Sequence, residues 1–200
     1  MLPLELGALR QAVTSGRTFE YRFFWGHTPR PDGKLSNACL SQWWPCSFTI
    51  DGTRYTTAEQ WMMASKARLF GDREALIAIL AATQPKECKA LGRAVRDFDE
   101  ATWRQHRFDI VTAGNVAKFG QDSTLRAYLL ATGEEILVEA SPTDCVWGIR
   151  QHRQHPDAQD PLRWRGQNLL GFALMRARSI LRGELVPPSL PARLTASMAE

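Results

Sequence analysis

The sequence predicts an α+β fold that is mainly helical, a single domain with a few short strands. Three observations favour this class. Several segments have helical periodicity behind capping residues, the strand-like segments are short, and no repeat or linker divides the 200 residues. With 44% hydrophobic residues, a chain of this length can bury a substantial core. We therefore expect a domain over residues 18–183, an N-terminal extension over 1–17 and a Pro-containing tail over 184–200.

Four segments have the composition of strands. Aromatic and β-branched residues are frequent in them, and turn residues bound them. Asp51-Gly52 predicts a hairpin between two of them, because Gly tolerates the positive φ of a tight turn. Residues 26–38 contain Pro, Gly and Asp, so we expect a loop there. In chain order, the expected strands cover residues 18–25, 47–50, 54–56 and 135–139.

Six helices are expected in the domain. Asp72 and Asp99 can accept hydrogen bonds from the free N–H groups of a first turn, and Pro85 fits the start of a short helix that Gly92 should end. In chain order, the expected helices cover residues 56–70, 72–83, 86–91, 100–119, 121–131 and 168–182.

The remaining segments are expected to be peripheral. Residues 1–17 predict a peripheral helix or extension. Residues 150–166 are polar and charged, so we expect them to be mobile. Three prolines after residue 183 exclude a continued helix, which predicts a tail.

The helix expected over residues 56–70 carries two charges on a mostly apolar face. Thr56 and Glu59 have the Thr-x-x-Glu spacing of a capping box. Glu59 and Lys66 lie on the same face but about 10 Å apart along the axis, too far for a direct ion pair. Each therefore needs another partner, which can be a ligand. Alternatively, Glu59 only caps the helix and Lys66 extends its ammonium to water.

Composition excludes several classes of protein. The net charge of +4 is mildly basic and fits a phosphate-bearing or nucleic-acid ligand. The four Cys and four His residues show no metal-ligand spacing, so we expect no metal, no cofactor and reduced thiols in a cytoplasmic protein. The N-terminus lacks the pattern of a secretory signal, and no apolar run is long enough for a membrane span.

Three carboxylates stand at the ends of expected elements: Glu59, Glu139 and Asp144. Breaking the bond between a ribose anomeric carbon and a nitrogen builds positive charge on the sugar, which a carboxylate can stabilise. An aromatic face can hold the base or sugar, and a cation can hold phosphate. The other candidates are the aromatics Trp103 and Trp147 and the cations Lys66, Arg93 and Lys118.

Each candidate also has an ordinary structural explanation. Trp103 can serve the core, Glu139 can be solvated and Asp144 can cap a turn. Arg93 and Lys118 can be surface charges, as most Arg and Lys residues are.

An ordered set of short motifs resembles the NADAR superfamily (NAD and ADP-ribose), which includes the YbiA-like N-glycosidases. Each motif alone is weak, but together they run in family order from about residue 20 to 182. They are FWG at 24–26, LSQW at 40–43, FTIDG at 48–52, YTTAEQWMMASKA at 55–67, LGR at 91–93, FD at 98–99 with Trp103, AKF at 117–119, LLATG at 129–133, LVEASPTD at 137–144, WG at 147–148, GQNLLG at 166–171 and LM at 174–175 with Arg178.

The resemblance implies a mainly helical α+β domain that hydrolyses N-glycosidic bonds to ribose without a metal. It implies that Glu59 and Asp144 are catalytic. The family's known substrates are ADP-ribosylated guanine in nucleic acid and ribosylamino-pyrimidine phosphates of early riboflavin synthesis, so the expected partner is a small-molecule nucleotide or an ADP-ribosylated nucleic acid. The substrate-binding residues that the resemblance implies are Phe24, Gly26, Ser41, Lys66, Arg93, Trp103, Lys118, Trp147 and Gly148.

The sequence departs from the family pattern at two places. Residues 40–43 read Leu-Ser-Gln-Trp where the family often has Phe-Ser-Asn-Phe, and Arg150 stands where the family often has Gly. Both changes concern the expected rim of the pocket and therefore the identity of the substrate. A module that binds ADP-ribose or NAD without cleaving it is the alternative, although a pocket for anionic phosphates does not need Glu59 and Asp144.

Overall fold

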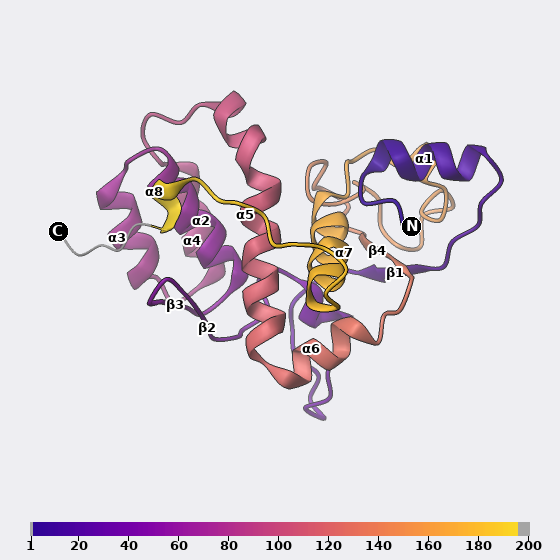
Figure 1. Ribbon diagram of the computed structural model, residues 1–200, viewed down its shortest axis with the longest axis horizontal. Helices are drawn as coiled ribbons and strands as arrows, with labels where there is room; N and C mark the ends of the chain where they lie inside the picture. Colours follow the sequence, from indigo (N-terminus) through magenta and orange to yellow (C-terminus); the bar gives the residue numbers. More distant parts are fainter. Residues whose placement is uncertain (1, 196–200) are drawn as a thin grey trace.

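The long helix α5 (Glu100–Gln121) is the axis of the fold in the computed structural model, which describes residues 2–195. On one side of α5 lie α2 (Ala58–Leu69), α3 (Arg73–Ala81) and α4 (Pro85–Arg93), and on the other lies α7 (Leu169–Leu181) (Figure 1). Asp99 begins α5 as expected, because its Oδ1 accepts the Thr102 N–H at 2.7 Å. Most of the helix α2 is buried within this arrangement.

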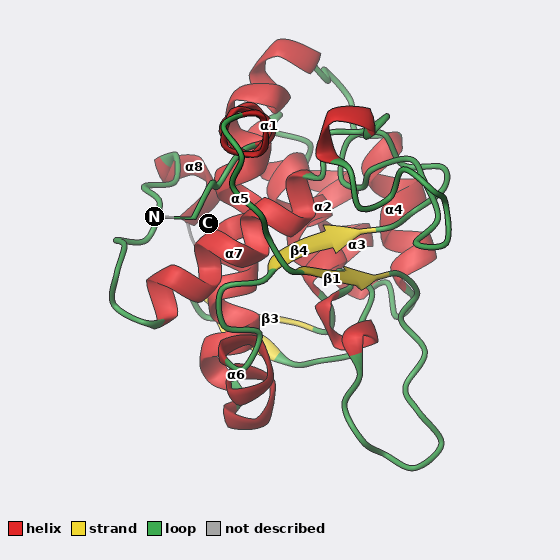
Figure 2. Cartoon of the chain, turned by 90° about the vertical axis from the view of Figure 1, so that its right-hand side faces the viewer, coloured by secondary structure: helices red, strands yellow, loops and turns green. Residues whose placement is uncertain are grey.

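Two pairs of short strands complete the fold. β1 (Tyr21–Phe24) pairs in parallel with β4 (Ile136–Glu139), and β2 (Phe48–Ile50) forms the expected hairpin with β3 (Thr53–Tyr55). Figure 2 shows β1 and β4 side by side and pointing the same way, so the loops that follow them begin at the same end. With these few strands among the helices, the expected α+β class is confirmed.

Helix α7 approaches β4 closely because of two residues at its start, Gly171, which has no Cβ, and Asn168, which has a left-handed backbone. A Cβ on Gly171 would lie 2.0 Å from the Leu137 carbonyl oxygen. Asn168 adopts a left-handed backbone with φ of 55°. Its side chain donates to the Leu137 carbonyl and accepts the Glu139 N–H, both at 2.9 Å. Asn168 thus satisfies the open edge of β4 in place of another strand.

The start of α2 differs from the prediction by one residue. Thr57, not Thr56, is the N-cap, and its Oγ1 accepts the Gln60 N–H at 3.1 Å. Gln60 Oε1 returns to the Thr56 N–H at 2.8 Å. The capping pair is therefore Thr57 and Gln60, since Gln serves as well as Glu in this motif. The predicted role of Glu59 in a capping box is wrong.

Two further helix boundaries differ from the prediction. Gly92 lies within α4 rather than ending it, and a Cβ there would lie 2.0 Å from Met63 Sδ. This Gly permits close packing of α4 on α2. Asp122 begins α6 (Ser123–Leu130) by accepting two backbone N–H groups, two residues later than the sequence predicted.

Residues 150–166 are folded against the N-terminal helix α1 (Leu6–Thr14), which corrects the expectation of a mobile segment. Arg10 donates to the carbonyl oxygens of Pro161 and Trp164 at 2.9 and 3.1 Å. Trp164 is buried and donates its indole N–H to Ala158. Buried apolar residues within this polar segment therefore hold it in place. The segment includes the short 3-10 helix η2 (Pro161–Arg163). A second 3-10 helix, η1 (Asn37–Leu40), lies elsewhere in the chain, shortly before Trp43.

After α7, the described residues up to 195 cross the helical face and dock on α2, which corrects the expected tail for this part of the chain (Figure 1). The rest of the expected tail, residues 196–200, lies outside the described residues. They form the short helix α8 (Ala192–Thr195), directly after Pro191. Leu194 is 2% exposed, and Arg193 donates to the Leu69 carbonyl at 2.9 Å. The prolines exclude a continuation of α7 but allow a new helix. Within residues 2–195, no helix has both the length and the apolar character of a membrane span.

Candidate active site

A cavity of about 650 Å³ opens where the N-terminal end of α2 meets the loops that follow β1 and β4. It brings together eight of the eleven residues predicted for the site: Gly26, Ser41, Glu59, Lys66, Arg93, Trp103, Asp144 and Trp147. The other three, Phe24, Lys118 and Gly148, are not among its lining residues. We call this space the carboxylate cavity, because Glu139 also lines it beside Glu59 and Asp144.

Glu59 lies in the first turn of α2 and is only 3% exposed. Its N–H donates to the Gln42 carbonyl at 3.0 Å, while its Oε1 has no hydrogen-bond partner among the described residues. Burial raises the pKa of Glu59 to about 7, although Lys89 and a hydrogen bond from the Trp43 side chain act in the opposite direction. Burial therefore outweighs the effect of the helix N-terminus, whose dipole favours the ionised form.

Glu139 is the last residue of β4 and the second carboxyl group of the cavity. Asn168 fixes its backbone, and its Oε2 is buried without a hydrogen-bond partner in the described structure. Burial raises the pKa of Glu139 to about 8, and the negative charges of Asp144 and Glu59 raise it further. The sequence signal for Glu139 was its position where a buried strand runs into a polar loop, but that signal did not separate catalysis from simple solvation.

Asp144 organises the loop after β4. Its Oδ1 accepts the N–H groups of Val146 and Trp147 at 2.8 and 2.7 Å. The Asp144 N–H in turn donates to Ser141 Oγ at 3.2 Å. This turn directs Trp147 to the cavity wall. The turn-capping explanation of Asp144 is thus correct for Oδ1, whereas Oδ2 accepts no backbone N–H from the described residues.

Gly148 serves packing beneath this loop. A Cβ there would lie 2.7 Å from the Glu139 carbonyl oxygen, so only Gly allows the loop to return over the end of β4. Phe24, predicted to bind substrate, is 2% exposed and belongs to the core beside a neighbouring cavity.

Four Trp residues line the carboxylate cavity. Trp103 and Trp147 were expected there, and the structure adds Trp25 and Trp43. Trp103 is 8% exposed, so it belongs to both the core and the cavity wall. Trp25 is exposed by 57% and stands at the mouth.

The cations of the cavity have different surroundings. Lys66 donates to the Gly92 carbonyl at 2.8 Å, and its Nζ lies 3.8 Å from the Phe98 ring centroid. Lys89 lines the cavity from α4 and lowers the pKa of both Glu59 and Glu139. Sequence reasoning missed Lys89, since nothing in its local sequence distinguishes it from a surface lysine. Arg93 was predicted, and Arg107 is another addition.

Lys118 does not reach the cavity, which corrects its predicted contact with substrate. Its Nζ donates to the carbonyl oxygens of Cys39 and Ser41 at 2.7 and 2.8 Å, and the residue is 1% exposed. Burial lowers the pKa of Lys118 to about 8. The ammonium therefore satisfies buried carbonyl groups of the chain that carries Ser41. Within residues 2–195, no group of three or more His, Cys, Asp or Glu side chains is arranged to hold a metal ion.

Comparison with known proteins places this architecture in a family. The model of the NADAR domain matches residues 23–182. N-glycosidase R617 of Acanthamoeba polyphaga mimivirus is 42% identical over 166 residues, which cover 80% of this chain and 96% of that protein. Riboflavin biosynthesis protein VVA0006 of Vibrio vulnificus (strain YJ016) is 30% identical over 72% of this chain, a match that covers 35% of that protein.

A solved structure has the same fold. The NMR structure of the Escherichia coli protein YbiA superposes with a TM-score of 0.67 at 24% sequence identity, over 92% of this chain and 95% of that one. Because the NADAR domain model matches most of the length of this chain, the chain belongs to the NADAR domain family.

Proposed function

We propose that this N-glycosidase hydrolyses the bond between a ribose anomeric carbon and a nitrogen of a ribosylated or ADP-ribosylated substrate, such as ADP-ribosyl-guanine in nucleic acid. The observation that carries the proposal is the convergence of Glu59, Glu139 and Asp144 on one cavity with Trp walls and cations. The family's N-glycosidases support the reaction type. The Trp walls and the cations of the cavity support a substrate that carries a base and a phosphate.

The carboxylates suit the charge that the reaction develops. As the C1′–N bond breaks, the ribose gains oxocarbenium character, and a nearby anion stabilises that charge. A buried anion does so more strongly than an exposed one, because water does not screen it. Glu59 is enclosed by the protein in this way.

The surroundings of the two glutamates divide the roles of base and acid between them. Lys89, Arg93 and a Trp43 hydrogen bond favour the ionised form of Glu59, against the charge of Asp144. For Glu139, Lys89 favours ionisation, and the two carboxylates Asp144 and Glu59 oppose it. We therefore assign Glu59 as the base that takes a proton from water and Glu139 as the acid. Environments that push two pKa values apart distinguish an acid from a base.

The step balances with these two groups. The C1′–N bond breaks and its electron pair goes to the leaving nitrogen, which takes the Glu139 proton. Water adds its oxygen to C1′ and gives its proton to Glu59. The products are the free base and the ribose with a C1′ hydroxyl. Transfer of a proton from Glu59 to Glu139 through water restores the starting state.

The remaining cavity residues would orient the substrate. Asp144 Oδ2 is available for a ribose hydroxyl or the attacking water, since the backbone bonds of the carboxylate use Oδ1. Trp103 and Trp147 can pack against the base or the sugar. Lys89, Arg93 and Arg107 can bind phosphate oxygens.

Hydrolysis of a ribosylamino-pyrimidine phosphate is the second candidate. It is favoured by the similarity to Riboflavin biosynthesis protein VVA0006 and by a cavity with both carboxylates and phosphate-binding cations. A non-catalytic ADP-ribose or NAD module is disfavoured. Such a module binds an anionic ligand without cleaving it, so it does not need carboxylates, which repel the phosphates. The cavity has four: Glu59, Glu100, Glu139 and Asp144.

A mass-spectrometric screen of the purified protein tests the proposal. The protein would be offered an ADP-ribosylated guanine oligonucleotide, ribosylamino-pyrimidine phosphates and NAD. We expect release of ADP-ribose and unmodified oligonucleotide from the first, and release slowed roughly 10²-fold or more by Glu59→Gln. Release from the pyrimidine phosphate alone would favour the second candidate, and binding without release of any product would support the non-catalytic module.

A further inference from the structure

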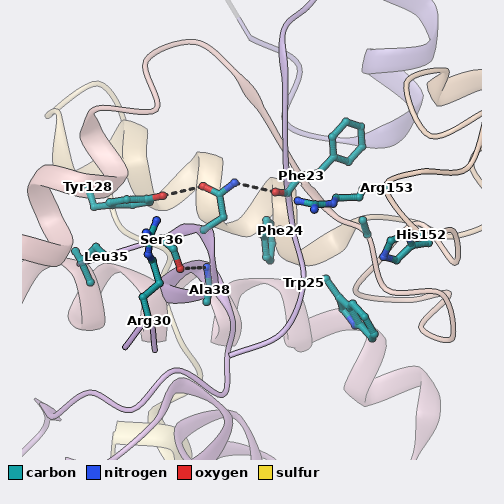
Figure 3. Close-up of a pocket in the computed structure, with 12 residues that line it drawn as sticks. Phe23, Phe24, Trp25, Arg30, Leu35, Ser36, Ala38, Tyr128, His152 and Arg153 are labelled. Atoms are coloured by element: carbon teal, nitrogen blue, oxygen red, sulfur yellow. Dashed lines mark hydrogen bonds between the residues drawn. The ribbon is translucent and has the colours of Figure 1, made fainter. Parts of the chain in front are cut away.

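A second cavity, of about 570 Å³, adjoins the carboxylate cavity, and Trp25 lines both (Figure 3). The charge of its lining is different. Arg30 and Arg153 are cationic, His152 is also a lining residue, and none of its lining residues is Asp or Glu. The carboxylate cavity, by contrast, has four carboxylates. The carboxylate cavity also has four cations, Lys66, Lys89, Arg93 and Arg107, so its charge is mixed. The charged side chains among the lining residues of the second cavity are cationic, and this cavity therefore suits an anion.

The wall of the second cavity is fixed by hydrogen bonds. The Asn37 side chain accepts the Tyr128 hydroxyl at 2.7 Å and donates to the Phe23 carbonyl at 2.9 Å, and these bonds are dashed in Figure 3. Ser36 Oγ begins the following turn by accepting the Ala38 N–H. The polar groups are thus held in place before a ligand binds, which lowers the entropic cost of binding.

Trp25 stands at the boundary between the cavities with its ring accessible. It follows β1 directly, and the adjacent Phe24 carbonyl accepts the Ala140 N–H at 2.9 Å. The ring packs edge-to-face with His152, at 5.8 Å between centroids and an interplanar angle of 89°. With 57% of the residue exposed, the indole can stack on a flat base.

Arg153 is the stronger of the two candidate phosphate ligands. Arg30 forms an exposed ion pair with Asp32 at 3.0 Å, which competes with a ligand. No ion pair involves Arg153 in the described part of the chain, and the segment around it is anchored by α1. A guanidinium group binds phosphate oxygens in a bidentate manner.

We propose that the second cavity binds a nucleotide phosphate of the substrate, beyond the ribose at which the bond breaks, with the attached base stacked on Trp25. This inference rests on the proposed function, which puts that ribose in the carboxylate cavity. The phosphate and base belong either to the adenylate end of an ADP-ribosyl group or to the next nucleotide of a strand. Both sources present the same chemistry to Arg153 and Trp25.

Binding titrations in a Glu59→Gln background test the proposal without turnover. The probes are ribose 5-phosphate, which has the reacting ribose and its own phosphate but no adenylate or second nucleotide, ADP-ribose, and a single-stranded DNA oligonucleotide. We expect Arg153→Gln and Trp25→Ala each to raise the Kd of ADP-ribose or of the oligonucleotide roughly fivefold or more, as loss of one ligand contact should. The Kd of ribose 5-phosphate should not change in Arg153→Gln, because Arg153 does not line the carboxylate cavity. Arg165→Gln, an exposed arginine of the same segment outside both cavities, is the matched control and should change none of the three.

The outcomes separate the sources and the hypotheses. A change for ADP-ribose alone identifies the adenylate end as the occupant, and a change for the oligonucleotide alone identifies the strand. Equal changes for ribose 5-phosphate, no change for any probe, or no binding of any probe would overturn the second site. Failure of the proposed function shows up separately, as absence of product release from wild-type protein in the substrate screen.

Discussion

The ammonium of Lys66 lies 2.8 Å from the carbonyl oxygen of Gly92, and this bond joins α2 to α4 at the wall of the carboxylate cavity. The helix positions of Glu59 and Lys66 already showed that the two side chains do not pair. The structure supplies the partner that Lys66 needs, a backbone carbonyl, together with the face of Phe98. Lys66 is therefore a structural cation with two further donors available to a ligand.

Lys66→Met and Lys89→Met should have different effects. Lys66→Met keeps the apolar stem but leaves the Gly92 carbonyl without its donor, so we expect a loss of about 1–3 kcal/mol in the free energy of unfolding. Lys89 has no hydrogen bond within the described chain, so Lys89→Met should leave stability nearly unchanged. It should instead raise KM for a phosphorylated substrate more than for its dephosphorylated counterpart. Denaturant unfolding and steady-state kinetics measure the two effects. Equal KM changes for both substrates would remove the phosphate role of Lys89.

Glu59→Gln should retain a folded protein and ligand binding but reduce turnover by roughly 10² or more, the range of a lost acid–base group. The backbone N–H of Glu59 keeps its bond to Gln42, and the cap at Thr57 is independent of the Glu59 side chain. Single-turnover kinetics with a melting curve check this outcome. Near-normal kcat would overturn the assignment. Glu20→Gln, an exposed carboxyl beside β1, is the matched control.

The same substitution should change how stability depends on pH. Burial raises the pKa of Glu59 from 4.5 to about 7, so the folded state keeps this proton to a higher pH than the unfolded state does. The stability it contributes is complete below about pH 4.5 and is lost as the pH rises to about 7. We compare the free energy of unfolding of Glu59→Gln with that of wild type at each pH. Between pH 4.5 and pH 8, this difference should shift in favour of the variant by on the order of 3 kcal/mol. Urea unfolding at both pH values measures this difference, and parallel stability profiles would contradict it.

Glu139→Gln should remove the alkaline limb of the pH–rate profile. If Glu139 acts as the acid, activity falls as its carboxyl group ionises, with a pKa of about 8. The variant should have a lower kcat, but its rate should not fall further in that pH range. The fall in rate at low pH, as Glu59 becomes protonated, should remain. A structural role would lower activity without moving either limb. Rates measured from pH 5 to pH 10, with Glu20→Gln beside them, distinguish these cases.

Trp147→Ala and Trp103→Ala should differ in stability but not in binding. Loss of stacking should weaken substrate binding by about 1–3 kcal/mol in each. Trp103 is 8% exposed and also fills the core, so its replacement should lower the melting temperature as well. Trp147 is only partly buried, so Trp147→Ala should lower the melting temperature less than Trp103→Ala does. Melting curves with and without ADP-ribose separate the effects. If Trp147→Ala unfolds the protein, its role is structural.

Lys118→Met should destabilise the protein without a selective effect on substrate. It removes the shared donor of two buried carbonyl groups, those of Cys39 and Ser41, which costs about 1–3 kcal/mol for each unsatisfied group. Because Lys118 lies outside the carboxylate cavity, KM for phosphorylated and dephosphorylated substrates should change by the same factor. Thermal melts and kinetics measure both. A KM change confined to the phosphorylated substrate would restore the original prediction.

Local sequence chemistry determined much of the fold. The Asp99 cap, the Asp51-Gly52 hairpin and the periodic apolar segments each depend on residues within one turn or one helix. They can therefore be predicted from the local sequence, without the rest of the chain. For the same reason, the first turn of α2 and the loop after β4 could be selected as positions for Glu59 and Asp144. The resemblance to NADAR proteins linked these positions to one reaction.

Tertiary packing decided the identity of the cations, the protonation of the acids and the place of the termini. Lys118 and Lys89 both fall within helices that the sequence predicts, but one lies in the core on two carbonyl groups and the other interacts with Glu59. The pKa values of Glu59 and Glu139 depend on burial and on charges from α4 and the loop after β4, contacts made between segments far apart in the chain. Burial and Coulomb interaction depend on distance in space rather than on sequence separation, so only the folded chain fixes them.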